Sequence, residues 1–150
     1  MIVYSSSKKD FLNDVLSGQI EEQILTSFVR EIGYTTGKSE INSWSKSMPY
    51  KSNVINNSSI PDDVGIAIEY KIPQTSKRID FIITGTNNEN RKVAVIVELK
   101  QWSEGISLTD QDGVLNTNFY GEVPHPSYQV WSYATLLEDF NSSIQEDDIS

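Results

Sequence analysis

The chain has no cysteine and no long apolar run, and each absence excludes a class of protein. Without cysteine it cannot form a disulfide framework or a thiolate metal site. No stretch approaches the roughly 18 consecutive apolar residues of a membrane-spanning helix. The first residues, MIVYSSSKKDF, place a short apolar stretch before the lysines, which is the reverse of a secretory signal peptide. The sequence therefore predicts a cytoplasmic protein without a membrane span.

The chain is also short of positive charge. It has 12 lysine and arginine residues against 21 aspartate and glutamate residues, a formal net charge of −9. Much of the excess lies at the end, in LLEDFNSSIQEDDIS, and residues 142–150 are interpreted as a solvated acidic tail. Because a free-standing nucleic-acid binder usually has a basic surface, strong nucleic-acid affinity is not expected of this chain alone. An acidic active site that works through a metal cation is compatible with the charge.

Capping residues and apolar residues at helical spacing predict three helices in the first third of the chain. The first helix begins at the N-cap Ser7 and stops at Gly18. The second is amphipathic and covers residues 20–32. The third begins at Ser39 and is expected to break near Pro49, because proline disrupts a helix interior.

After residue 63 the apolar period changes from helical to alternating. Residues 66–72 alternate apolar and polar side chains, which predicts a half-buried strand. Residues 78–85 form the second expected strand, and KVAVIVELKQW, which begins at Lys92, forms the third. The short turns between them favour an antiparallel meander. The third strand is apolar on both faces, so it is expected to be central and covered by helices.

Residues 103–124 are a long polar connection in which TDQDG is expected to close a small excursion hairpin. Pro126 then occupies the first position of a final helix, where proline is tolerated. The element order predicts one mixed α/β (α+β) domain. Residues 1–60 would be its N-terminal helical part, residues 61–141 its core and residues 142–150 its tail.

Three charged residues interrupt two apolar strands. Glu98 and Lys100 are two residues apart in one strand, so their side chains leave the same face, and Asp80 lies in the neighbouring strand. Two carboxylates at one place suit Mg²⁺ or Mn²⁺, and a lysine beside them can polarise a water molecule or neutralise a phosphate. The alternative is structural: Glu98 and Lys100 form a solvated ion pair, and Asp80 pairs with Arg78 or Lys77.

The order of these residues resembles the PD-(D/E)xK nuclease superfamily. RID supplies the first acid, Asp80, and ELK supplies Glu98 and Lys100, while Ile79 replaces the nominal proline. The final helix contains Gln129 with a tyrosine four residues later, similar to the QxxxY element of RecB-like branches. The strings AIEYKIPQTSKRIDFIITG, VIVELKQW and HPSYQVWSYATLLEDF are similar to the N-terminal nuclease-like domain of a bacterial family. In that family the domain precedes a superfamily I-type helicase or ATPase module, which this sequence lacks.

The resemblance implies a restriction-endonuclease-like core with the order αβββαβ, preceded by extra helices. It implies hydrolysis of phosphodiester bonds in nucleic acid, DNA more than RNA, with Mg²⁺ or Mn²⁺ as the cofactor. Asp80, Glu98 and the Leu99 carbonyl would bind the metal ion, Lys100 would position or activate the attacking water, and Gln129 would orient the site or the strand. Nucleic acid and the helicase or ATPase module are the implied partners.

Four further residues are candidates with open alternatives. Glu40 resembles an extra acid that many superfamily members place on the helix before the sheet, or it favours the helix dipole. Glu69 lies on the polar side of the first strand, where it faces the first acid or pairs across the hairpin. His125, the only histidine, caps the final helix or belongs to the site. Tyr133 shares a helical face with Gln129 or packs in the core.

Two other functions stay open at this point. One is a catalytically silent nuclease-like module that binds nucleic acid or a protein partner. The other is a purely structural domain, in which the three charges would have to form one satisfied ion-pair network.

Overall fold

A computed structural model describes residues 2–33, 35–56, 59–100, 102, 105–141, 144 and 149. The fold is mixed α+β, as predicted. In chain order the elements are β1 (Ile2–Ser7), α1 (Lys8–Leu16), α2 (Ile20–Ile32), α3 (Lys38–Asn56), β2 (Gly65–Lys71), β3 (Arg78–Thr86), β4 (Lys92–Val97), β5 (Ile106–Leu108), β6 (Val114–Thr117), β7 (Gly121–Pro124) and α4 (Pro126–Phe140). No helix in the described part of the chain is long and apolar enough to cross a membrane.

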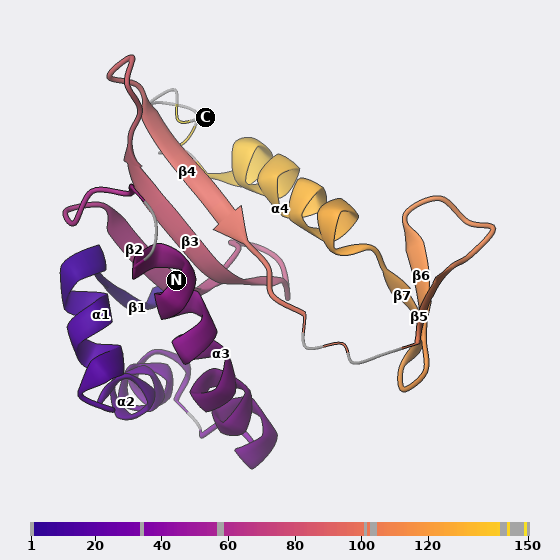
Figure 1. Ribbon diagram of the computed structural model, residues 1–150, viewed down its shortest axis with the longest axis horizontal. Helices are drawn as coiled ribbons and strands as arrows, with labels where there is room; N and C mark the ends of the chain where they lie inside the picture. Colours follow the sequence, from indigo (N-terminus) through magenta and orange to yellow (C-terminus); the bar gives the residue numbers. More distant parts are fainter. Residues whose placement is uncertain are drawn as a thin grey trace.

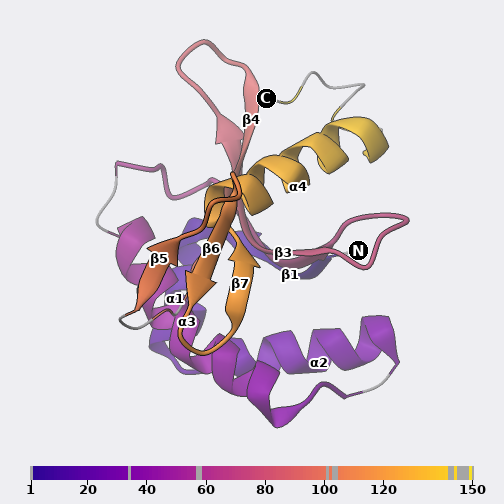
Figure 2. The same ribbon diagram turned by 90° about the vertical axis from the view of Figure 1, so that its right-hand side faces the viewer.

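The main sheet is antiparallel, has the strand order β1-β2-β3-β4 and carries helices on both faces. Helices α1, α2 and α3 cover one face, and α4 covers the other (Figures 1 and 2). A buried cluster that includes Phe11, Trp44 and Phe81 fills the space between the sheet and α1–α3. A second cluster, which includes Ile82 and Leu137, lies between the sheet and α4.

The first two helices begin and end where the sequence predicts. The hydroxyl oxygen of Ser7 caps α1 by accepting a hydrogen bond from the backbone N–H of Asp10 at 3.1 Å. Gly18 follows α1 with φ 68, and Gly33 ends α2 with φ 84. Both angles lie in the left-handed region, which glycine adopts without the steric cost of a side chain.

Helix α3 continues through Pro49, so the predicted break there is wrong. A proline in a helix interior costs about 3 kcal/mol because it removes a hydrogen bond and crowds the preceding turn. Burial of a large apolar side chain contributes about 1.5–3 kcal/mol, so the packing of one helix face offsets this cost. The buried residues on that face are Trp44, Met48, Lys51 and Ile55.

Strand β1 corrects the expectation that residues 1–60 are helical. It pairs antiparallel with β2, with Tyr4 opposite Ile68, and it buries Val3 and Tyr4. Its second half is a run of serines, which gives no apolar alternation for sequence reasoning to detect. Residues 1–60 therefore supply a strand to the same sheet as the strands that follow.

Strands β2, β3 and β4 form the predicted antiparallel meander, but β4 lies at the edge of the sheet and not at its centre. Val95 in β4 is 51% exposed, which is consistent with an edge. The final strand of the expected αβββαβ order is not found among the described residues. After Asn141 these are only Ile144 and Ile149, so most of the expected acidic tail, residues 142–150, lies outside the described part.

The polar connection forms a second, three-stranded sheet with the order β5-β6-β7. The predicted excursion hairpin is confirmed by the pairing of β5 with β6, and β7 adds a third strand. Figure 1 shows this small sheet standing apart from the main sheet, at the end of α4 where the helix begins. Pro126 is the first residue of that helix, as predicted.

Candidate functional site

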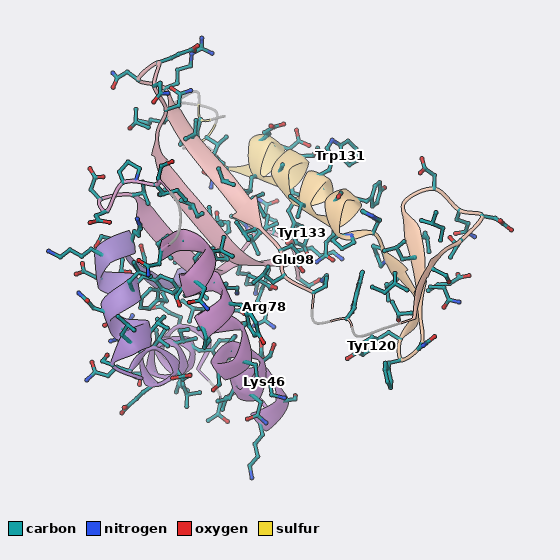
Figure 3. All side chains as sticks on the ribbon, in the orientation of Figure 1. Lys46, Arg78, Glu98, Tyr120, Trp131 and Tyr133 are labelled. Atoms are coloured by element: carbon teal, nitrogen blue, oxygen red, sulfur yellow. The ribbon has the colours of Figure 1, made fainter. Side chains whose placement is uncertain are left out.

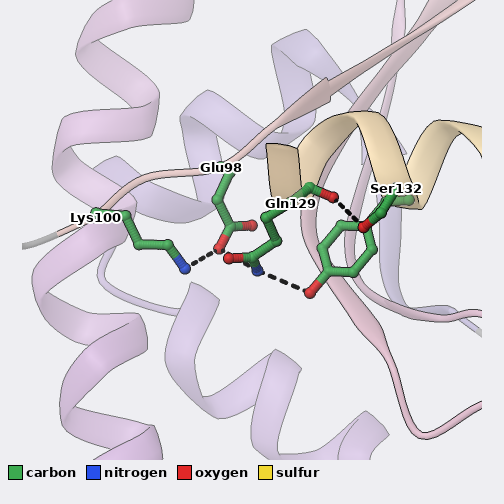
Figure 4. Close-up of polar contacts among 5 residues, drawn as sticks. Glu98, Lys100, Gln129 and Ser132 are labelled. Atoms are coloured by element: carbon green, nitrogen blue, oxygen red, sulfur yellow. Dashed lines mark hydrogen bonds and ion pairs between the residues drawn. The ribbon is translucent and has the colours of Figure 1, made fainter. Parts of the chain in front are cut away.

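Glu98 lies directly after the last residue of β4, so the strand ends before the predicted ExK pair. Its side chain is 3% exposed. Oε1 of Glu98 accepts hydrogen bonds from Lys100 Nζ at 2.5 Å and from Gln129 Nε2 at 3.0 Å (Figure 4). The two charged side chains therefore meet although neither residue is in a strand, and α4 contributes a third member.

The second carboxylate oxygen of Glu98, Oε2, is buried and has no hydrogen-bond partner in the part of the chain that the structure describes. Burial raises the pKa of Glu98 and outweighs the hydrogen bond from Lys100, which lowers it, while Asp80 adds to the increase. A buried carboxylate oxygen without a donor is costly. Oε2 is therefore the atom of this site best suited to bind a cation.

Asp80 lies in β3 and lines a cavity of about 180 Å³ together with Leu99. It makes no hydrogen bond or ion pair with another residue of the described ranges. Arg78, the alternative partner, pairs instead with Glu40 at 2.5 Å and with Glu69 at 3.1 Å. The carboxylate of Asp80 thus borders the cavity without a fixed cationic partner.

Glu69 has a left-handed backbone, with φ 55, which is uncommon outside glycine. Ile68 packs toward α1–α3, yet Tyr70 packs toward α4, so the predicted regular alternation of residues 66–72 is wrong. The left-handed residue reverses the alternation and brings Glu69 to the α3 side. There its Oε1 accepts a hydrogen bond from Trp44 Nε1 at 2.9 Å. Such strained residues persist where the surrounding structure holds them, often at functional sites.

Glu40 and Glu69 share Arg78 and line the same cavity as Asp80. In the β2–β3 register, Glu69 lies between the pairs that Ile68 and Tyr70 form with the two neighbours of Asp80. Glu69 also forms an ion pair with Arg78 across the hairpin. Glu40, in the first turn of α3, also accepts a hydrogen bond from the Thr36 hydroxyl. Ion pairs and hydrogen bonds therefore hold both carboxylates in place in the lining of the cavity.

Lys51 is the residue of this region that sequence reasoning missed. It lies on α3, is 5% exposed and lines the cavity with Asp80. A lysine in a polar helix is ordinarily interpreted as solvated. The signal that could have found it is its spacing, because Lys51 occupies a position of the apolar face between Met48 and Ile55.

Helix α4 places Gln129 and Tyr133 at the site and His125 outside it. Gln129 Nε2 donates to the Tyr133 hydroxyl at 2.8 Å as well as to Glu98 (Figure 4). Figure 3 shows Glu98 and Tyr133 between the end of β4 and α4. His125 is the N-cap of α4, and its Nδ1 accepts a hydrogen bond from the backbone N–H of Ser127 at 3.1 Å. It borders a different cavity, of about 730 Å³, beside the β5–β6 turn.

The donor set fits a hard cation that needs few protein ligands. No group of three or more His, Cys, Asp or Glu side chains is placed to hold a metal ion within the described ranges. Mg²⁺ keeps several waters and is commonly held by one or two carboxylates plus substrate phosphate. Asp80, Glu98 Oε2 and the Leu99 carbonyl are suited to that mode by their chemistry.

No protein-family model matches the chain, and no curated protein or solved structure was found to match it. The interpretation of the site depends on its own residues.

Proposed function

We propose that the chain is a metal-dependent nuclease domain that hydrolyses phosphodiester bonds of nucleic acid, DNA in preference to RNA. The observation that carries this proposal is the environment of Glu98. One of its oxygens is held by Lys100 and Gln129, and the other is buried without a donor among the described residues. Asp80 is close enough to raise the pKa of Glu98. The structural alternative, a solvated ion pair at the end of a strand, explains neither the buried Glu98 oxygen without a donor nor the second acid nearby.

The proposed fold is a restriction-endonuclease-like core. The meander β2–β4 followed by α4 supports it, because the RID, ELK and QxxxY residues lie in that order on β3, directly after β4 and on α4. A hydrogen bond from Gln129 to Glu98 joins the last two of these segments. The domain is proposed to act in the cytoplasm as part of a larger helicase or ATPase protein. That partner would add to the weak nucleic-acid affinity expected of an acidic domain.

The residues have separate roles in this proposal. Asp80, Glu98 and the Leu99 carbonyl would hold Mg²⁺ or Mn²⁺, which when bound polarises the phosphate and lowers the pKa of a bound water. Lys100, itself fixed by Glu98, positions the attacking water, and Gln129 fixes the carboxylate of Glu98. Hydrolysis forms a bond from the water oxygen to phosphorus and breaks one phosphorus–oxygen ester bond. The products are a phosphate monoester and a hydroxyl group.

Cleavage of labelled single-stranded and double-stranded DNA and RNA in Mn²⁺ tests this function. The wild-type chain should cleave at least one of these substrates and stop when the metal is chelated. Asp80→Ala should lose cleavage, whereas Glu122→Gln, an exposed acid on β7, should keep it. Metal-dependent cleavage retained by well-purified Asp80→Ala would contradict the proposal.

A second candidate function is favoured by one observation: residues 101–150 contain no lysine or arginine and expose Phe119, Tyr120 and Trp131. Exposed aromatic residues in an acidic setting suit a protein partner better than a phosphate backbone. In this alternative the domain docks a partner or senses nucleic acid without cutting. Wild-type protein that binds Mn²⁺ but cleaves none of the four substrates would favour it.

A further inference from the structure

Lys51 is a buried cation on a helix face that otherwise packs apolar side chains. Its neighbours on that face are Trp44, Met48 and Ile55, and the lysine itself is 5% exposed. The ammonium lies 5.4 Å from the ring centroid of Phe81. A methionine or leucine would fill the same position without the cost of removing an ammonium group from water. The position of Lys51 therefore calls for an interaction that an apolar side chain cannot make.

A structural counter-ion would be expected to contact one of the neighbouring acids. Lys51 makes no ion pair or hydrogen bond within the described ranges. Glu69 already pairs with Arg78, and Glu98 already pairs with Lys100. Asp80 lines the same cavity as Lys51 but does not pair with it. None of these acids contacts the ammonium of Lys51. Burial lowers the pKa of Lys51, and the charges of the acids raise it against that effect, Asp80 most strongly among the three.

The cavity is where the ammonium can meet a ligand. Lys51, Asp80 and Leu99 all line its volume of about 180 Å³, which is large enough to admit a phosphate group. The other cation in its lining, Arg78, is occupied by two carboxylates. A charge-assisted hydrogen bond from an ammonium to a phosphate oxygen is among the stronger polar contacts in proteins. Of the two cations that line the cavity in the described part of the chain, Lys51 is the one that remains available for such a hydrogen bond.

We propose that Lys51 is a phosphate-binding residue of this cavity, whose ammonium donates to a non-bridging oxygen of a nucleic-acid phosphodiester beside Asp80. This inference rests on the proposed function and adds a ligand contact from α3, outside the strand and loop that carry the ExK residues. Lys51 and Lys100 then have different roles. Lys51 holds the phosphate, and Lys100 positions the water.

Oligonucleotide affinity tests the inference without relying on cleavage. The probe is a fluorescein-labelled DNA of about 20 nucleotides, single-stranded or duplex, titrated in Ca²⁺, which shares the oxygen-ligand preference of Mg²⁺. Denaturing electrophoresis after each titration confirms that the probe is intact. Lys51→Met should raise the Kd about tenfold or more, because a charge-assisted hydrogen bond is lost.

The matched control is Lys46→Met, which removes the same charge from an exposed position of the same helix. Figure 3 shows Lys46 at the outer side of α3, away from the sheet. Its Kd should stay within about twofold of the wild-type value. Lys51→Gln keeps a polar tip without the charge, and it should lose affinity as Lys51→Met does. Circular dichroism and urea unfolding of both Lys51 variants show that the loss occurs in folded protein.

The outcomes separate this inference from the proposed function. Equal oligonucleotide affinity in wild type and in either folded Lys51 variant overturns the inference, and Mn²⁺ binding by the same wild-type protein leaves the proposed metal site standing. A wild-type chain that binds neither oligonucleotide nor Mn²⁺ overturns both. Loss of oligonucleotide affinity in the Lys51 variants, with Lys46→Met unchanged, supports the inference.

Discussion

Residues 1–100 hold all 12 lysine and arginine residues of the chain and 12 acidic residues, whereas residues 101–150 hold 9 acidic residues and no lysine or arginine. The first region is therefore balanced in charge, and the second carries the whole net charge of the chain. The site draws on the two regions differently. Its charged members, Asp80, Glu98, Lys100 and Lys51, come from the first region, while the second supplies the uncharged pair Gln129 and Tyr133.

This difference indicates how a polyanion would approach. Phosphate groups are attracted to the cations of the first region and repelled by the acids of the second. The β5–β7 sheet carries Asp110 and Asp112 in or next to its first turn and Glu122 in β7. Under the proposed function, the acidic region would repel nucleic acid from the small sheet and leave the first region as the less repulsive side of approach.

The largest expected effect comes from removing a cation of the first region. Lys100→Met should lower the cleavage rate roughly 10²–10³-fold, the range seen when one positioned polar group of an active site is deleted. Mn²⁺ affinity should not fall, because Lys100 is not a proposed ligand. Gel-based rate measurements beside Lys46→Met check the first expectation, and calorimetry checks the second. A rate within threefold of wild type would remove Lys100 from the mechanism.

The second prediction weakens a polar link from the acidic region to the site, the hydrogen bond from Gln129 to Glu98. Tyr133→Phe removes the hydroxyl that accepts from Gln129, so Gln129 is less firmly held against Glu98. The free energy of unfolding should fall by about 1 kcal/mol. Urea denaturation measures it, with Tyr128→Phe as control, since Tyr128 lies on the same helix and is 55% exposed. Equal losses in both variants would mean that the link contributes nothing specific.

The third prediction concerns a buried acid of the balanced region. Burial raises the pKa of Glu69 and outweighs the Trp44 hydrogen bond and the Arg78 charge, which lower it. A raised folded-state pKa means that the native state binds more protons, so this contribution to stability is lost as pH rises from the unfolded value of about 4.3 through the raised value.

Urea denaturation at several pH values between about 4 and 8 measures this effect. Wild type should lose more stability than Glu69→Gln over the range, and Glu122→Gln should follow wild type. Glu98, whose pKa is also raised by burial, accounts for the decline that remains in Glu69→Gln. Parallel curves for wild type and Glu69→Gln would show that Glu69 does not titrate as argued.

The smallest expected effect is neutralisation of the outlying acids. A triple variant with Asp110→Asn, Asp112→Asn and Glu122→Gln should bind the labelled oligonucleotide roughly twofold to fivefold more tightly in low salt. The gain should vanish in about 0.5 M salt, because exposed charges are screened. A gain that persists in high salt would point to a direct contact and would weaken the comparison between the two regions.

Sequence reasoning predicted the parts of the fold that local signals determine. The Ser7 cap, the glycine stops at Gly18 and Gly33, the meander and the Pro126 helix start all depend on residues near one another in the chain. Apolar composition could not tell that β4 is an edge strand, because both faces of a strand can be covered while one edge stays unpaired.

The candidate site, like the fold, was predicted only where signals in the sequence are local. Asp80 and Glu98 were predicted because they interrupt apolar strands, and Gln129 because it matches the QxxxY element of the resemblance. Packing between elements accounts for two features that local rules do not predict. Helix α3 continues through Pro49, although proline disfavours a helix interior, and Glu69 has a left-handed backbone, although it is not a glycine. Lys51 was missed for this reason, since only the intact helix places it on the buried face.

Mn²⁺ binding, measured by isothermal titration calorimetry, is the first test of the proposed metal site at Asp80 and Glu98. The wild-type chain, Asp80→Ala, Glu98→Gln and the control Glu122→Gln are compared under one condition near pH 7.5. We expect binding by wild type and Glu122→Gln, and loss of binding in Asp80→Ala and Glu98→Gln, because those two acids would supply the carboxylate oxygens. Undiminished binding in both site variants, or none in the wild type, would contradict the proposed metal site.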